Sequence, residues 1–187
     1  MLAITTRLRL FYLIHASKPS SDRPVYRVIS QTRVRTILEL GVGTGHRALR
    51  MIEVASQQTP VNRVSYIGVD LFEAHPAGKA PALTLKEAHR VLRVTGARIR
   101  LLPGDPLTAL RPMVNGLEKI DLLIVSAGLD AESMARTWYY LPRVLHARSI
   151  VLLEEPSGSS DGVKIRALAP REVRRLAATS TPRRRAA

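Results

Sequence analysis

The sequence contains no cysteine and few aromatic residues. The absence of cysteine excludes disulfide bonds, thiolate nucleophiles and cysteine-based metal sites. Aromatic residues make up 4% of the chain, so few side chains are available to stack on the bases of a nucleic acid. The histidines are not spaced as zinc ligands usually are, and we therefore expect no metal site.

The sequence also lacks a long hydrophobic run. The apolar segment at 10–14 is too short to span a membrane, and no convincing signal-peptide cleavage pattern follows it. We therefore expect a cytoplasmic protein that has no membrane partner.

Acids are scarce relative to bases. The chain has 29 Lys and Arg against 15 Asp and Glu, a formal net charge of +14, which would attract nucleic acid or another anionic surface. Most of the bases are dispersed arginines, as on solvated helix faces, and only Arg183-Arg184-Arg185 form a run. The composition therefore permits nucleic acid as a partner. A small molecule is the other partner that we consider.

The 187 residues, of which 45% are hydrophobic, fit one domain with a sizeable core. Apolar runs alternate with helical patterns, which predicts an α/β fold with crossover connections and a mostly parallel sheet. We expect strands at 36–40, 64–69, 99–102, 120–125, 149–153 and 163–168, and helices at 46–56, 83–94, 106–116, 131–145 and 170–178. We assign residues 1–178 to this domain and residues 179–187 to a disordered, Arg-rich tail, since the tail has nothing to bury.

A glycine-rich segment, ELGVGTG at 39–45, follows the first expected strand. Alternating glycines permit a tight turn and a close approach of the backbone to a ligand, and the next helix offers free N–H groups. Ligands of open parallel sheets bind at the carboxyl ends of the strands. The segment therefore predicts a loop that holds a nucleotide-like cofactor.

Two classes of cofactor fit this loop. The segment GTGHRA at 43–48 matches the G-x-G-x-x-G/A pattern of dinucleotide-binding proteins, so an NAD(P)-binding oxidoreductase is one alternative. An acid such as Glu39 would repel a pyrophosphate bound beside it, unless its side chain points away.

Glu39, Gly41, Gly43 and Gly45 resemble motif I of the class I S-adenosylmethionine-dependent methyltransferases, and the resemblance extends over about 36–155. It implies a Rossmann-like fold, an open and mostly parallel sheet with helices on both faces, and S-adenosylmethionine as cofactor. In that family the glycine loop lies against the methionine part of the cofactor, and the acid ahead of it supports the amino group.

The resemblance also assigns roles to residues that follow later strands. Asp70, after the second strand, matches the acid that binds the ribose hydroxyls, although a plain strand-end cap is the alternative. Gly104 and Asp105 resemble the element that faces the adenine amino group, while Asp105 fits equally well as the N-cap of the next helix.

Ser126 follows the fourth expected strand and joins the predicted cofactor-binding residues. In similar O-methyltransferases this position often carries an acid that binds a metal or assists the acceptor. The serine therefore argues against a metal-dependent enzyme and leaves the catalytic residues unassigned. Asp130 and the pair Glu154-Glu155 are the nearest candidates for a general base.

The resemblance implies methyl transfer to an acceptor that the sequence does not identify and that we expect to be a small molecule. A non-catalytic, basic binding domain with the same fold is a further alternative. Few residues follow Pro156, too few for the family's usual closing hairpin. We therefore expect a sheet truncated at this end, whose edge is covered by a second subunit in a homodimer or by the N-terminal residues.

Overall fold

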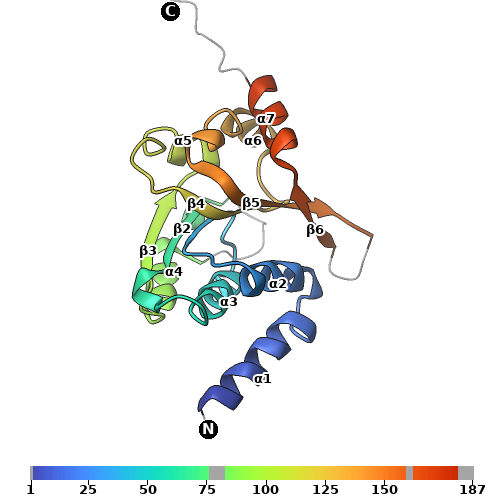
Figure 1. The fold of residues 1–187 in the computed structure, drawn as a ribbon. Helices are drawn as coiled ribbons and strands as arrows, with labels where there is room; N and C mark the ends of the chain where they lie inside the picture. Colours follow the sequence, from blue (N-terminus) through green and yellow to red (C-terminus); the bar gives the residue numbers. More distant parts are fainter. Residues whose placement is uncertain (1, 76–82, 159–161, 181–187) are drawn as a thin grey trace, which may run out of the picture.

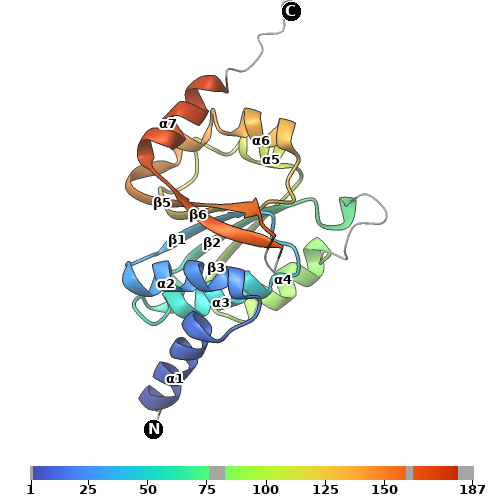
Figure 2. The ribbon, with the colours of Figure 1, turned by 90° about the vertical axis from the view of Figure 1, so that its right-hand side faces the viewer.

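The computed structural model describes residues 2–75, 83–158 and 162–180. Within these residues the sheet consists of β1 (Thr36–Leu40), β2 (Ser65–Asp70), β3 (Arg98–Pro103), β4 (Ile120–Val125), β5 (Leu145–Pro156) and β6 (Val163–Leu168). The helices are α1 (Leu2–His15), α2 (Arg23–Gln31), α3 (His46–Ala55), α4 (Leu85–Arg93), α5 (Pro106–Leu110), α6 (Ala131–Thr137) and α7 (Pro170–Thr179). In Figures 1 and 2, α2, α3 and α4 cover one face of the sheet, and α5, α6 and α7 cover the other.

The strands are arranged in the order β3-β2-β1-β4-β5-β6, and all neighbours are parallel except β5 and β6. The strand order reverses at β1, which lies between β2 and β4. A crevice for ligands is expected at such a reversal, outside the carboxyl ends of the strands. The predicted Rossmann-like fold class is confirmed, with helices on both faces.

The core explains why the central strands are almost continuously apolar. Ile37 and Leu122 pack in a cluster with α2 and α3, whereas Leu38 and Leu123 pack in the cluster on the opposite face. Side chains alternate between the two faces of a strand, so a sheet with both faces covered requires apolar residues at nearly every position. By the same alternation, Glu39 lies on the face covered by α3.

Within the described residues, the sheet ends in the strand expected at 163–168, and this single strand stands in place of the family's usual closing hairpin. β6 pairs with β5 in antiparallel register, with Leu153 opposite Arg166 and Glu155 opposite Lys164. A single closing strand therefore fits in the residues that follow Pro156. It occupies the edge of β5 for which a second subunit or the N-terminal residues were expected.

Two predicted helices are shorter than the sequence pattern suggested. The helix expected at 106–116 ends at Leu110, because Pro112 has no N–H to continue it. The helix expected at 131–145 ends at Thr137 and is followed by turns and a short 3-10 helix that contains Pro142. Trp138 lies in those turns, where it is buried in the core as its apolar character indicates.

β5 also begins earlier than the expected 149. Its first residue, Leu145, pairs with Ile120, and the next pair is Leu122 with Ile150. The additional residues on β5 form an irregularity that interrupts the alternation on which the sequence prediction relied. The predicted tail at 179–187 overlaps α7, which runs to Thr179, and residues 181–187 lie outside the described part.

The N-terminal segment forms elements that the sequence reading did not assign. α1 extends away from the layered body (Figure 1) and is followed by a short 3-10 helix at Ser20–Asp22 and by α2. Leu13 in α1 and Tyr26 in α2 are buried. No helix in the described ranges has the length and apolarity that crossing a bilayer requires.

Candidate functional site

The glycine loop joins β1 to α3 at the reversal of strand order. Gly41, Gly43 and Gly45 all have positive φ angles, of 90°, 57° and 73°. A Cβ atom on Gly41 would lie 2.7 Å from the Cβ of Ser126, whereas one on Gly43 would meet nothing within 4 Å. Packing against the end of β4 therefore requires glycine at position 41. At position 43 the loop faces open space, as a loop that holds a ligand should.

Asp70, at the end of β2, is buried beside this loop. Its Oδ2 accepts a hydrogen bond of 2.7 Å from the backbone N–H of Gly43, and its Oδ1 lies 2.6 Å from Nε2 of His75. The Nδ1 of His75 is buried and has no hydrogen-bond partner among the described residues. A carboxylate, a buried nitrogen without a partner and an open glycine thus come together. The exposed backbone of Gly43 and the carboxylate of Asp70 can contact a polar ligand.

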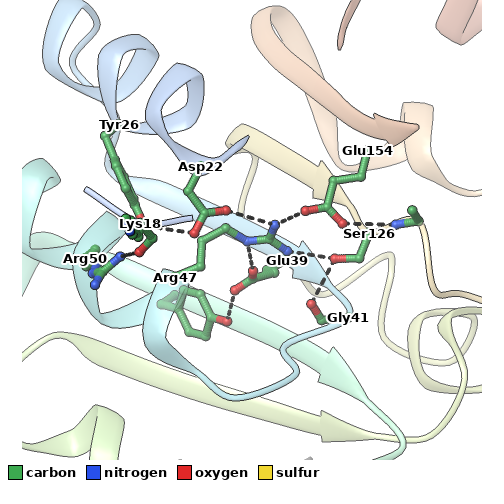
Figure 3. A network of polar contacts seen from close by, with 11 residues as sticks. Lys18, Asp22, Tyr26, Glu39, Gly41, Arg47, Arg50, Ser126 and Glu154 are labelled. Atoms are coloured by element: carbon green, nitrogen blue, oxygen red, sulfur yellow. Dashed lines mark hydrogen bonds and ion pairs between the residues drawn. The ribbon is translucent and has the colours of Figure 1, made fainter. Parts of the chain in front are cut away.

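Glu39 is fully buried at the other side of the loop (Figure 3). Its Oε1 accepts a hydrogen bond of 2.6 Å from Nε of Arg47, and its Oε2 accepts one from the hydroxyl of Tyr66. Burial raises the pKa of Glu39, and the charge of Arg47 and the hydrogen bond from Tyr66 offset this rise only in part. Both carboxylate oxygens are therefore occupied by side chains of the protein.

Arg47 connects Glu39 to the ends of two further strands (Figure 3). Its Nη2 donates a 2.7 Å hydrogen bond to Oγ of Ser126, and its Nη1 pairs with Glu154 and lies 3.5 Å from Oδ1 of Asp22. Burial lowers the pKa of Arg47, but the three carboxylates outweigh burial and raise it. We call Asp22, Glu39, Arg47 and Glu154 the arginine cluster. It contains three acids around one base.

Ser126 and Gly104 fix the loops that surround the glycine turn. The hydroxyl of Ser126 donates a 3.0 Å hydrogen bond to the carbonyl of Gly41, which ties the end of β4 to the glycine loop. The N–H of Gly104 donates a 2.8 Å hydrogen bond to the carbonyl of Asp70, which places the loop after β3 beside the end of β2.

Asp105 caps α5, as one of its two predicted roles requires. Its Oδ1 accepts hydrogen bonds from the N–H of Leu107 at 3.0 Å and from the hydroxyl of Ser133 at 2.5 Å. Burial raises the pKa of Asp105, but the bonds from Ser133, Thr108 and the helix N–H groups outweigh it and lower the pKa overall. Contact with an adenine stays a prediction for this residue.

Each of the three acids considered as general bases already pairs with another group of the protein. Asp130 caps α6 through a 2.7 Å hydrogen bond from the N–H of Ser133. Glu154 belongs to the arginine cluster and also accepts the N–H of Ala127 at 3.0 Å, while Glu155 pairs with Arg166 at 2.6 Å. Within the described ranges, no three His, Asp or Glu side chains converge as metal ligands do.

Sequence reasoning missed four residues of this edge: Asp22, Arg47, Tyr66 and His75. Arg47 and His75 lie close in sequence to predicted positions, and their proximity to Glu39 and Asp70 is the only signal that they gave. Asp22 comes from the segment before α2, whose place over the carboxyl edge no local pattern indicates. Tyr66 lies on β2, where an aromatic residue normally indicates only core packing.

No protein-family model matches the sequence, and no curated protein matches it. Solved structures match the fold. The O-methyltransferase from Bacillus cereus, in complex with S-adenosylhomocysteine, gives a TM-score of 0.58 at 13% identity, over 94% of this chain and 76% of that one. TomG from Streptomyces achromogenes, an O-methyltransferase in complex with S-adenosylmethionine, gives 0.56 at 14%, over 87% and 68%. Fibrillarin from Aeropyrum pernix, with natively bound S-adenosylmethionine, gives 0.50 at 17%, over 79% and 56%.

The chain has the fold of the class I S-adenosylmethionine-dependent methyltransferases. Within this methyltransferase fold, the glycine loop, Asp70 and Ser126 lie at the carboxyl edge of the sheet. The chain spans only 56% of the length of the fibrillarin. At these low identities the likeness establishes the architecture, and the activity has to be argued from the site itself.

Proposed function

We propose that this protein is an S-adenosylmethionine-dependent methyltransferase that acts on a small molecule. The observation that carries the proposal is the pairing of Asp70 with the N–H of Gly43, 2.7 Å apart, at a loop that leaves open space over Gly43. A ligand over this glycine meets exposed backbone that carries no side chain, beside the carboxylate of Asp70. An adenosine with its two ribose hydroxyls has the donors that such a carboxylate accepts.

The site residues divide between the parts of the cofactor. Asp70 would accept hydrogen bonds from the ribose, and Gly104 with Asp105 would border the adenine. Gly43 and Ser126 would border the methionine end, where Glu39 would contribute negative charge through the arginine cluster. The sulfonium supplies an activated methyl group, so the protein's main task is to align donor and acceptor, which lowers a barrier by about 7–11 kcal/mol in favourable cases.

The charges near the loop favour this cofactor over a dinucleotide. The arginine cluster places three carboxylates around one guanidinium, and all four side chains are largely buried. Like charges repel strongly in such a low-dielectric environment. A pyrophosphate would bring further negative charge to this edge, whereas the sulfonium and ammonium of S-adenosylmethionine complement it.

The contacts of the site's acids also bear on the kind of acceptor. Each acid considered as a general base already has a partner in the fold, so transfer here depends on alignment and suits a nucleophile that needs little deprotonation. Two of the similar structures, from Bacillus cereus and Streptomyces achromogenes, are named O-methyltransferases. We carry over from them only the expectation of a small acceptor.

Calorimetric titration of the full chain tests the cofactor assignment. We expect saturable binding of S-adenosylmethionine and S-adenosylhomocysteine, and no binding of NAD⁺ or NADP⁺ at the same concentrations. Binding of the dinucleotides alone would replace this proposal with the oxidoreductase alternative. Transfer of a labelled methyl group to members of a small-molecule library then identifies the acceptor.

A further inference from the structure

The amino ends of the parallel strands form a basic edge, opposite the edge that carries the glycine loop. Arg35 precedes β1, Arg63 comes shortly before β2, Arg98 begins β3 and Lys119 precedes β4. All four are exposed. The acids of the candidate site lie at the carboxyl ends instead. The amino ends of the strands therefore gather basic side chains, of which Arg98 lies 3.8 Å from Glu118.

A groove of about 730 Å³ opens in this basic edge beside the starts of β1 and β5. Arg33, Arg35 and Arg148 line it and are exposed. Their guanidinium groups make no hydrogen bond or ion pair with the part of the chain that the structure describes. We call these three side chains and the cavity between them the basic groove.

The acid in the lining does not neutralise these arginines. Asp121 accepts hydrogen bonds from the backbone N–H groups of Arg35 at 2.7 Å and Thr36 at 3.0 Å, and from Nε2 of His146 at 2.9 Å. Burial raises the pKa of Asp121, but these hydrogen bonds outweigh burial and lower it. The carboxylate therefore stays ionised and accepts hydrogen bonds from the backbone. It does not pair with the guanidinium groups of the groove, which remain available to bind an anion.

The two contacts of the His146 ring determine which of its nitrogens carries the proton. Its Nδ1 accepts a 3.0 Å hydrogen bond from the backbone N–H of Arg148, so the proton on Nε2 is the one donated to Asp121. These backbone contacts hold the chain that carries Arg35 and Arg148 in place. The two arginines thus project from a fixed backbone.

We infer that the basic groove binds the phosphodiester backbone of a nucleic acid. Guanidinium groups bind phosphate through paired N–H donors, and three unpaired ones around a concave surface fit a chain of phosphates. A flat bilayer surface matches a concavity poorly. The described lining contains no Phe, Tyr or Trp, and its one imidazole, that of His146, is held by Asp121 and the N–H of Arg148, so we expect contact with phosphates and little readout of the bases.

This surface is separate from the proposed reaction site, because the glycine loop lies at the opposite ends of the same strands. A polymer in the basic groove is held away from the methyl-transfer edge and is not the acceptor there. The inference does not rest on the proposed function. Binding of S-adenosylhomocysteine and binding of a polynucleotide can therefore fail independently of each other.

Fluorescence anisotropy with a labelled oligouridylate of about 16 nucleotides tests the inference in the full chain. The variant Arg33→Gln, Arg35→Gln and Arg148→Gln removes the three charges and leaves the backbone bonds to Asp121 and His146 intact. We expect its affinity to fall by about tenfold or more. The slope of log affinity against log salt concentration should decrease in magnitude by about 2, since each lost phosphate contact contributes about 0.7 for a single strand.

A matched control removes the same charge elsewhere. Arg171, Arg174 and Arg175 on α7 are exposed and do not line the groove, so their triple Gln variant should keep most of the affinity. Equal weakening in both variants, or no binding by the unmodified protein, would overturn the inference. So would binding to phosphatidylserine vesicles that depends on the groove arginines and that the oligonucleotide does not displace.

Discussion

The guanidinium Nε of Arg47 lies 2.6 Å from a carboxylate oxygen of Glu39, and the Glu39 side chain is fully buried while that of Arg47 is largely buried. This contact joins the end of β1 to the first turn of α3. The same guanidinium reaches Ser126 after β4 and Glu154 on β5. One side chain thus ties together the ends of three strands that border the proposed cofactor site.

Replacement of Arg47 should therefore destabilise the fold. Arg47→Met leaves three buried carboxylates without their cation, and loss of one partner of a buried ion pair typically lowers the free energy of unfolding by about 3–5 kcal/mol. Urea denaturation measures this change. The control Arg90→Met, at an exposed position of α4, should stay within about 0.5 kcal/mol of the unmodified protein.

A second substitution separates charge from packing at this position. If unpaired charge causes the loss, Glu39→Gln should recover part of the stability when it is added to Arg47→Met, because one buried carboxylate is removed. A double variant less stable than Arg47→Met alone would mean that the hydrogen bond from Tyr66 to an ionised Glu39 matters more than the charge balance.

Gly41 and Gly128 provide a contrast within the same edge of the sheet. Gly41→Ala should lower the free energy of unfolding by about 1–3 kcal/mol, because its Cβ would lie 2.7 Å from that of Ser126. Its φ of 90° adds strain for any residue with a Cβ. Gly128→Ala meets nothing within 4 Å and should be nearly neutral in thermal unfolding. Similar losses in both variants would argue against the close contact between the loop and β4.

The stability contributed by Asp121 should depend on pH. The pKa of this carboxyl is lower in the folded than in the unfolded protein, so its contribution is fully present above about pH 4 and is lost as the pH falls through the folded value. At neutral pH, Asp121→Asn should lower the free energy of unfolding by about 1–3 kcal/mol, since the charged acceptor of two backbone N–H groups is lost.

Urea unfolding at neutral pH and at a series of values below about pH 4 checks the sign. The difference between the unmodified protein and Asp121→Asn should shrink as the pH falls. A constant difference across the series would mean that the carboxylate charge makes no contribution.

The sequence predicted the elements that have strong local patterns. The strands at 36–40 and 120–125 were predicted with their observed bounds, because burial on both faces requires apolar residues throughout. The helices after β3 and β4 were predicted too long, because their apolar periodicity continues past Pro112 and Pro142 into turns. Pro112 stopped the first helix although the periodic pattern persisted, whereas the second ended at Thr137, before the 3-10 helix that contains Pro142.

The candidate site was predictable only as far as it follows strands. Asp70 was assigned through the resemblance to the methyltransferase family, and in the structure it lies beside Gly43 at the ligand edge, while its contact with a ribose stays a prediction. Asp22 and Arg47 were not identified, because their encounter depends on how the segment before α2 crosses the sheet. Long-range packing of this kind leaves no periodic signal in the chain.

If a cofactor binds against the open backbone of Gly43, matched glycine variants should differ in their binding of S-adenosylhomocysteine. Gly43 and Gly162 both have positive φ, and a Cβ on either meets nothing within 4 Å. Valine therefore imposes similar backbone strain at both positions. We expect Gly43→Val to abolish calorimetrically detectable binding and Gly162→Val to bind as the unmodified protein does. Unchanged affinity in folded Gly43→Val would show that no cofactor binds against this glycine.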